Sequence, residues 1–459
     1  MDDPKNKTGV YAVRAVEVVS DAGGELERRN FGTAGLRGLA CILSTCVTSG
    51  GPVLMVWGLI YAAAGAMLIA LSLGEMASAY PSSRGPMEWA YNFSSPKHRR
   101  FISYCTGHLN YIGYCVILAG FGVLIGQQIL TLVVLNDPSF VITQWKVFLI
   151  AEAAILAATL FNIFCMAIMP IIDIVSLYFF FFSFLAYLIV PIVCARHLNH
   201  ALKTPKFVFT ESINLTGYDS MNGGDFVAFM IGLSGVSTAF GGTDAVVHIA
   251  EECEHPERDV PRTMWLTVVI GFLSSFVLLI SLLFAVVDMD SILGTATGVP
   301  YIQLVYNATQ SFSGTVCMSL MIIIITFLAM IGMVLSTSRT AFTVARDGGL
   351  FTQTYFALIS PRWNVPIRVM MVTSGLSAAL ACTILGSTYA LYSFLNCVLL
   401  LNWLCYGICI VALLISGRKY HTSGPFRLGR VGCQIDELLY QTELGGGTTI
   451  YRDERDESY

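Results

Sequence analysis

Residues 232–244 read GLSGVSTAFGGTD and place four glycines and one aspartate inside an apolar segment that extends from 226 to 250. Glycine allows a helix to unwind, and a carboxylate at membrane depth is costly unless it faces a cavity or a partner. Glycines also cluster at positions 32, 35 and 38, five apolar segments earlier. Interrupted segments in corresponding positions of two halves indicate an inverted-repeat transporter that binds its substrate near the membrane midplane. The alternative interpretation is that these glycines only allow close helix packing.

The composition excludes a soluble protein. Hydrophobic residue types make up 55% of the 459 residues and charged types 12%, whereas soluble domains carry about 25% charged residues. The stretches 291–338 and 369–417 contain no Asp, Glu, Lys or Arg, and a spanning helix needs only about 20 apolar residues. The apolar segments are 32–48, 52–74, 103–135, 145–164, 171–195, 226–250, 263–287, 316–338, 367–386 and 389–416. We therefore expect an all-α polytopic membrane protein with about ten transmembrane helices.

The placement of Lys and Arg predicts the orientation of the chain. Nineteen of them fall in the N-terminal tail, the start of the C-terminal tail and the loops after the second, sixth and eighth segments. The opposite loops hold three, in addition to Lys146 at a helix end. Because cytoplasmic loops are enriched in Lys and Arg, we expect both termini in the cytoplasm. The chain then divides into a cytoplasmic N-terminal tail (1–31), a transmembrane core (32–416) and a cytoplasmic C-terminal tail (417–459).

The remaining composition bears on partners and cofactors. The formal net charge is -4 and no basic block is present, so we expect no nucleic-acid partner. The 13 cysteines include no CxxC pair, which argues against a disulfide framework and against a zinc site. We expect a lipid bilayer, a small-molecule substrate and a coupling cation as the partners, and neither a metal nor a cofactor.

Four motifs occur in a fixed order along the chain. They are Ser49-Gly50-Gly51-Pro52, Glu75-Met76-Ala77-Ser78-Ala79-Tyr80-Pro81, Phe240-Gly241-Gly242-Thr243-Asp244 followed by Pro261-Arg262, and Ser338-Arg339 followed by Ala345-Arg346-Asp347-Gly348-Gly349-Leu350. Together they resemble signatures of the fungal amino acid/choline permeases, which include GABA and choline permease relatives in the amino acid–polyamine–organocation superfamily. The resemblance runs from about residue 32 to residue 430. It implies a LeuT-type fold of two inverted five-helix repeats and cation-coupled uptake of a small nitrogenous solute.

The resemblance also implies that the interrupted sixth segment lines the substrate site. The residues carried over are Gly235, Ser237, Thr238, Phe240, Gly241, Gly242, Thr243 and Asp244. Phe240 would form an aromatic wall or lid. The amides around Gly241 and Gly242 would suit a substrate carboxylate, because a helix N-terminus carries a partial positive charge.

Aromatic side chains offer faces for a quaternary ammonium group. The candidates are Tyr111, Tyr114, Phe240, Tyr392 and Trp403. Aromatic residues make up 12% of the chain, and most of them are expected to contact lipid or to pack. The sequence therefore does not favour choline over an amino acid.

Asp173 and Asp244 are the candidates for coupling transport to a cation. Asp173 opens the fifth segment, where the family usually has an asparagine, and a protonatable side chain at that position suggests proton coupling. The alternative is that Asp173 is a helix N-terminal carboxylate stabilised by the helix dipole.

A polar helical face follows the glycine pair. By their spacing, the residues that share it are Asp244, His248, Glu251 and Glu252. We expect this face to line a water-accessible cytoplasmic pathway with charge pairing to Arg262 or Arg339. A proton relay along the face and a metal site of His and carboxylate ligands are the alternatives.

The chain departs from the family pattern at two places. Arg37 interrupts the first segment, and the family's Gly-Gly-Gln after helix 2 reads Arg84-Gly85-Pro86. The family also usually has twelve spans, against ten here. Our first hypothesis is a secondary active transporter of amino acids or related amines, such as GABA or choline, that works by alternating access with a proton as the coupling cation. The second is a transport-defective paralogue or a membrane nutrient sensor of the same fold.

A membrane enzyme would need a catalytic cluster, and only the His248 face qualifies. Because that face lies within the transporter-like motif, we do not expect an enzyme. We expect an integral multi-pass protein of the plasma membrane rather than of the vacuolar membrane.

Overall fold

The computed structural model describes residues 46–218, 223–294, 299–349 and, with gaps, 353–439. The described residues form helices and connecting loops and contain no strand. Eight helical stretches are long and apolar enough to cross a membrane, by length and composition, and a shorter apolar helix covers Leu400–Ile415. These nine stretches match the second to tenth predicted segments, which confirms an all-α polytopic membrane protein. Most of the first segment, including Arg37 and the glycines at 32, 35 and 38, lies outside the described residues.

Helices of very different lengths follow one another along the chain. They are α4 (Gly51–Val53), the π-helix η1 (Leu54–Gly58), α5 (Leu59–Ala79), α6 (Pro86–Phe93), α7 (Arg99–Asn136), α8 (Gln144–Phe164), the 3-10 helix η2 (Met166–Ile168), α9 (Met169–His197), α10 (Pro205–Thr210), α11 (Gly224–Ser237), the 3-10 helices η3 (Thr238–Phe240) and η4 (Thr243–Glu252), α12 (Pro256–Phe284), α13 (Met289–Leu293), α14 (Pro300–Thr309), α15 (Phe312–Arg346), α16 (Gln353–Phe356), α17 (Ile367–Ala381), α18 (Thr383–Gly386) and α19 (Thr388–Ile415).

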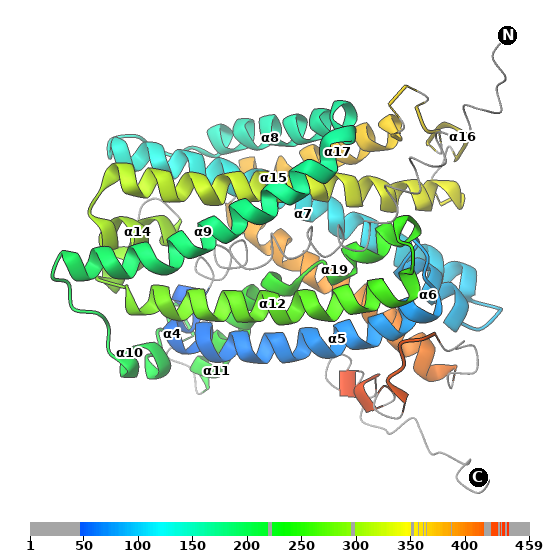
Figure 1. Ribbon diagram of the computed structural model, residues 1–459, viewed down its shortest axis with the longest axis horizontal. Coiled ribbons are helices and arrows are strands. Elements are labelled where there is room, and N and C mark those ends of the chain that lie inside the picture. The colour runs from blue at the N-terminus through cyan, green and yellow to red at the C-terminus, as the bar shows by residue number, and fades with distance from the viewer. Residues whose placement is uncertain are drawn as a thin grey trace, which may run out of the picture.

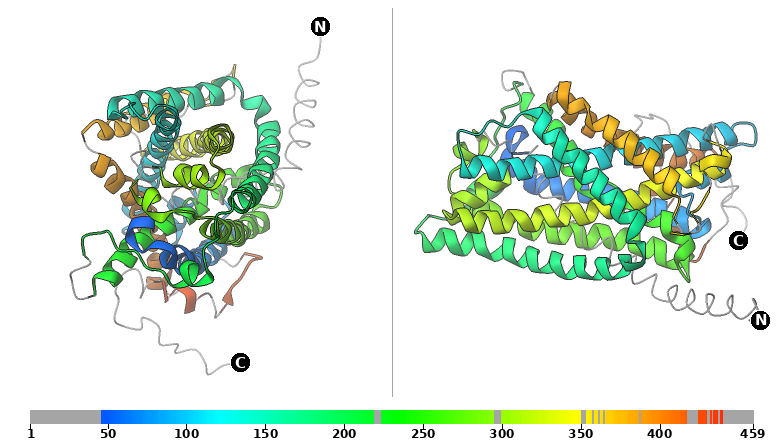
Figure 2. Two further views of the ribbon diagram at one scale, coloured as in Figure 1. Left: turned by 90° about the vertical axis from the view of Figure 1, so that its left-hand side faces the viewer. Right: turned by 90° about the horizontal axis from the view of Figure 1, so that it is seen from above.

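The long helices run roughly along one axis and form a single bundle (Figures 1 and 2). The most extensive pairing joins α5 to α12, which lie side by side in Figure 1. A second group centres on α7, which packs against α6, α8, α15, α17 and α19. This arrangement matters for the site, because the chain that follows α11 runs between the two groups and contacts α5, α12 and α15.

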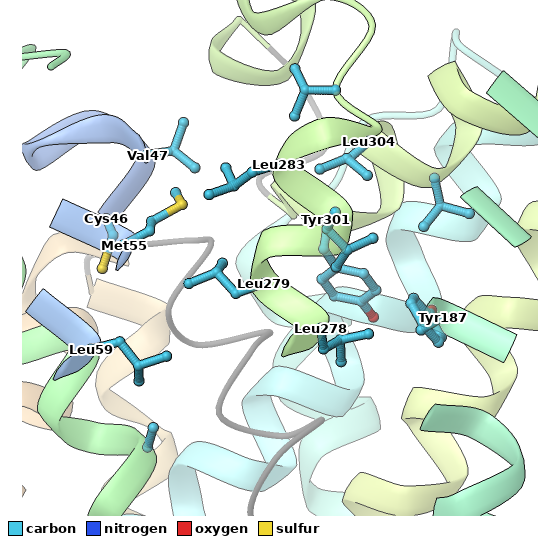
Figure 3. Packing of buried hydrophobic residues seen from close by; sticks show 14 of the residues in the cluster. Cys46, Val47, Met55, Leu59, Tyr187, Leu278, Leu279, Leu283, Tyr301 and Leu304 are labelled. Carbon is cyan, nitrogen blue, oxygen red and sulfur yellow. The ribbon is translucent and has the colours of Figure 1, made fainter. Parts of the chain in front are cut away.

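A hydrophobic cluster fills the end of the bundle that is predicted to face away from the cytoplasm (Figure 3). Tyr301 and Leu304 of α14 pack there against Leu278 and Leu279 of α12 and against Tyr187 of α9. α14 is thus a short helix whose apolar face is buried in the bundle.

On the outer faces of the bundle, large apolar side chains are exposed rather than buried. Large apolar side chains of α8 and α9 are exposed, among them Leu149, Leu156, Phe182 and Leu185. An apolar exterior is what a hydrocarbon environment requires. The bundle accordingly has both the spans and the surface of an integral membrane protein.

Candidate substrate and coupling site

The sixth span is interrupted at the predicted position. α11 ends at Ser237, a 3-10 turn follows, and Gly241 is extended with φ -66° and ψ 148°. Gly242 then takes φ +81°, in the left-handed region that residues with a Cβ avoid. The chain continues as η4, where a 3-10 run of this kind marks strain or a hinge. The prediction that the helix of the sixth segment is interrupted is therefore confirmed.

The two interpretations of the glycine cluster apply to different glycines. A Cβ on Gly232 would lie 2.1 Å from Leu54 Cδ2, so Gly232 allows two helices to approach closely. A Cβ on Gly242 would meet no atom within 4 Å. At position 242 a glycine is needed because the backbone there is left-handed, and this turn changes the direction of the chain.

The hydroxyl groups around the break bond to carbonyl groups of the same segment. Ser237 donates to Leu233, Thr238 to Gly235 and Thr243 to Phe240, at 2.8, 2.5 and 2.9 Å. These bonds satisfy carbonyl oxygens near the places where regular helical bonding is lost. The hydroxyl hydrogens are thus engaged, and toward a bound solute these three residues present oxygen lone pairs.

Asp244 lies two residues beyond the break and is fully buried. Its carboxylate accepts hydrogen bonds from Asn110 Nδ2 and Tyr114 OH on α7, both at 2.7 Å, and from Tyr406 OH on α19 at 2.6 Å. Three donors at these distances compensate a charge that would otherwise be very costly to bury. We refer to these four residues with His248 as the Asp244 cluster.

His248 joins the cluster to the loop between α5 and α6. Its Nδ1 is 2.9 Å from the carbonyl oxygen of Ser83, and since a carbonyl only accepts, Nδ1 carries the hydrogen. Its Nε2 lies 3.8 Å from Asp244 Oδ2, which is too long for a hydrogen bond. The hydroxyl of Ser83 donates to Glu251 Oε1 at 2.5 Å. A chain of polar groups thus leads from Asp244 past His248 and Ser83 to the exposed Glu251.

Four members of this polar region were not predicted as site residues: Ser83, Asn110, Asn402 and Tyr406. Asn402 precedes Tyr406 by one helical turn on α19, and Asn110 precedes Tyr114 by one turn on α7. Polar side chains four residues apart share a helical face, so two such pairs in apolar spans were a usable signal. The carboxamide of Asn402 is buried, and neither its oxygen nor its nitrogen has a hydrogen-bond partner among the described residues.

Replacing Gly113 with alanine is expected to lower stability by about 1 kcal/mol relative to the same replacement at Gly375, because the added Cβ forces the terminal oxygen of Asn402 to move at the α7–α19 contact. A Cβ there would lie 2.6 Å from Asn402 Oδ1. Thermal unfolding in detergent measures the effect. Gly375→Ala, in α17, is the matched control, because nothing lies within 4 Å of its Cβ position. Adding Asn402→Ala should restore part of the loss, and equal melting temperatures for the two single variants would contradict the expected contact.

The bonds to the Asp244 carboxylate described above do not come from the other predicted residues. Asp173 is buried near the start of α9 and is not among the groups that bond to Asp244. Arg339 is half-buried on α15, and Glu252 ends η4. Phe240 packs at the edge of the hydrophobic cluster of Figure 3.

The aromatic candidates do not gather around one point in the described part of the chain. Tyr111 and Trp403 belong to two separate hydrophobic clusters, and Phe240 to a third. Tyr114 uses its hydroxyl on Asp244 and contacts the His248 ring edge-on at 5.6 Å. The site is therefore organised around a carboxylate, and among the candidates whose side chains the structure describes, Tyr114 touches it; the side chain of Tyr392 lies outside them.

Comparison with known proteins agrees with this geometry. A family model described as amino acid permease matches residues 31–431. The chain belongs to the amino acid permease family. The permease is 30% identical over 395 residues to a choline transporter of Saccharomyces cerevisiae, covering 86% of this chain and 69% of that protein. It is 28% identical over 400 residues to a putative amino acid/polyamine transporter of Macrophomina phaseolina, covering 86% of each chain.

A plant relative extends the comparison. The permease is 24% identical over 419 residues to the amino-acid permease BAT1 of Arabidopsis thaliana, covering 87% of this chain and 78% of that one. The family and these relatives are transporters, so the permease is a multi-pass membrane transporter of amino acids or amines and not an enzyme. The predicted family is thereby confirmed.

Proposed function

We propose that this permease imports an amino acid or a related amine, such as choline or GABA, together with a proton by alternating access. The observation that carries the proposal is the Asp244 cluster, a buried carboxylate directly after the break and held by donors from two other spans. We place both termini in the cytoplasm and the protein in the plasma membrane. Residues 235–244 would line the substrate site.

The geometry of Asp244 and His248 supports a shared proton. Because Nδ1 of His248 donates to the Ser83 carbonyl, Nε2 carries a hydrogen only when the ring is an imidazolium. That hydrogen would face Asp244 Oδ2 across 3.8 Å. A movement of less than 1 Å, or one intervening water molecule, would allow the proton to pass between the two side chains.

Protonation of Asp244 would also loosen the bundle. A neutral carboxyl group is a weaker acceptor than a carboxylate, so the bonds from Tyr114 and Tyr406 would weaken together. These donors belong to α7 and α19, whereas Asp244 belongs to η4. A proton at this position would therefore favour movement of η4 relative to the α7 group, which is the coupling that symport requires.

The substrate would bind at the break itself. The first amide groups of η4 lack partners within that helix and suit a carboxylate, whereas the oxygen lone pairs of Thr238 and Thr243 suit an ammonium group. Phe240, which is half-buried, would form an apolar wall. These complementary groups fit a small zwitterion or amine, in agreement with the names of the relatives.

Uptake in a yeast strain that lacks its own choline and amino acid transporters tests the proposal. Radiolabelled choline, GABA and a panel of amino acids would be supplied at external pH 5 and pH 7, with and without a protonophore. We expect faster uptake of at least one solute at pH 5 and its loss with the protonophore. Uptake that ignores the protonophore would contradict proton coupling. Absence of all uptake despite surface expression would favour the sensor or the transport-defective paralogue.

His248→Gln is expected to abolish the difference in uptake between pH 5 and pH 7 while leaving surface expression unchanged. The glutamine amide can still donate to the Ser83 carbonyl but cannot carry a proton. The matched control is His255→Gln, because His255 is exposed on the loop after η4. If the double variant His248→Gln, Glu251→Gln kept the wild-type pH dependence of uptake, a proton relay along this face would be ruled out.

A further inference from the structure

A cavity of about 530 Å³ lies between α6, the first turns of α7 and the end of α15. It is at the end of the bundle that is predicted to face the cytoplasm. Its walls include Arg84, Glu88, Arg100, Tyr104 and His108. None of the residues that line it bonds to Asp244. The volume falls within the range of small-molecule sites, about 300–1,000 Å³.

The surroundings of this cavity are basic. Residues 84–108 and 344–349 contain five Lys or Arg and two Asp or Glu, a net charge of +3. The two acids are already engaged, since Arg84 bonds to Glu88 Oε2 and to Asp347 Oδ1, each at 2.9 Å. By contrast, Lys97 and Arg100 form no ion pair with any described residue. Arg100 lines the cavity on the α7 side, and Lys97 lies in the turn just before α7, so the uncompensated charge there is positive.

The start of α7 adds to this positive potential. The helix begins at Arg99 with no acidic residue in its first turn and no side-chain cap. The Arg99 amide already bonds to the Ser95 carbonyl, so the amides of Arg100 and Phe101 and the helix dipole favour an anion. The guanidinium group of Arg99 lies 4.7 Å from the centre of the Tyr91 ring. Arg99 is thus held by an aromatic face, and its charge is not neutralised by a carboxylate there.

Two aromatic side chains place the cavity at the membrane boundary. Phe101 is 71% exposed and Tyr104 is 50% exposed on the first turns of α7. Aromatic side chains at the ends of spanning helices lie at the level of the lipid headgroups. His108 stacks beside Tyr104 with ring centres 4.1 Å apart and bonds to its carbonyl through Nδ1 at 2.9 Å. The Nε2 of His108 is then available to a ligand in the cavity.

We propose that this cavity binds the phosphorylated headgroup of an anionic phospholipid in the cytoplasmic leaflet. The phosphate group would be held by Arg100, by Lys97 and by the amides of Arg100 and Phe101. Phe101 and Tyr104 would contact the glycerol and acyl part, which a soluble phosphate ester lacks. Anionic lipids are concentrated in the cytoplasmic leaflet, and basic clusters next to a spanning helix attract them.

Direct binding to the purified full-length permease tests this proposal without any transport assay. The probe is a fluorescent dioctanoyl phosphatidylinositol phosphate, with dioctanoyl phosphatidylcholine as the zwitterionic comparison. The double variant Lys97→Gln, Arg100→Gln is expected to bind the probe about 30-fold more weakly, since each basic residue near the surface contributes about a factor of five. The control is Lys203→Gln, Lys206→Gln, which removes two lysines, one half-buried and one exposed, from the opposite end.

Several outcomes separate the alternatives. Arg100→Lys should retain most of the affinity, and an unchanged melting temperature shows that the double variant is folded. Equal affinity for phosphatidylcholine, or equal affinity in the double variant and its control, would overturn the proposal. If free inositol bisphosphate displaced the probe as strongly as the unlabelled lipid does, the ligand of the cavity would be a soluble phosphate ester and not a lipid.

Discussion

Replacing Asp244 with asparagine is expected to lower the rate of uptake about 100-fold while the protein still reaches the cell surface. The carboxylate accepts three hydrogen bonds, from Asn110, Tyr114 and Tyr406. An asparagine side chain has a single acceptor oxygen, and its NH₂ group would face a donor. Both tyrosines bond to Oδ1 and Asn110 bonds to Oδ2, so the substitution loses the bond from Asn110 and weakens the two from the tyrosines. Hydrogen bonds to a charged group contribute about 1.5–3 kcal/mol each and those between neutral groups about 0.5–1.5 kcal/mol, so the combined loss corresponds to about a hundredfold.

The same substitution removes the proposed proton carrier. Any residual transport in Asp244→Asn should therefore be insensitive to external pH and to a protonophore. Initial uptake rates, normalised to the amount of protein at the surface, provide the measurement. Asp137→Asn is the control, because Asp137 is exposed between α7 and α8 and bonds only locally to Ser139. Wild-type uptake with an unchanged pH profile in Asp244→Asn would remove the basis of the coupling proposal.

Replacing Gly242 with valine is expected to lower uptake about 30-fold. Gly242 has φ +81°, a conformation that costs about 1–2 kcal/mol for a residue with a Cβ and more for a β-branched one. No atom lies within 4 Å of the added Cβ, so the cost arises in the backbone and not from a clash. The chain relieves it by leaving the left-handed region, and this displaces Asp244 from its donors.

Two companion variants isolate that cause. Gly332→Val in α15 adds the same side chain where nothing lies within 4 Å and the backbone is regularly helical, so it should transport normally. Gly242→Asn should retain more activity than Gly242→Val, because asparagine tolerates the left-handed region. Equal uptake by Gly242→Val and Gly332→Val would show that the break does not depend on this glycine.

Local sequence patterns predicted the position of the break in the sixth span, but not which glycine allows close packing and which allows the turn. The glycines at 232, 241 and 242 and the carboxylate of Asp244 mark the interruption within a few residues. The sequence left open whether the glycines served packing or unwinding. The structure assigns Gly232 to close packing and Gly242 to the left-handed turn, because that distinction depends on which helix lies beside each residue.

The aromatic candidates show where pattern analysis was insufficient. Five aromatic residues were candidates for a quaternary ammonium, yet Tyr111, Phe240 and Trp403 pack in three separate clusters. Tyr406 was absent from that set and bonds directly to Asp244. Residue type alone does not determine which face of a spanning helix points inward, because lipid and helix neighbours are both apolar.

The sequence by itself determined that this chain crosses a membrane repeatedly and where its sixth span is interrupted. Both properties are local, since bilayer thickness sets the length of an apolar segment and glycine and aspartate mark a helix that does not continue. Only the tertiary structure decided what surrounds Asp244. Its donors lie 134, 130 and 162 residues away along the chain, and they meet it because α7 and α19 pack beside η4. That packing depends on the three-dimensional fit of whole helices, which no short stretch of sequence specifies.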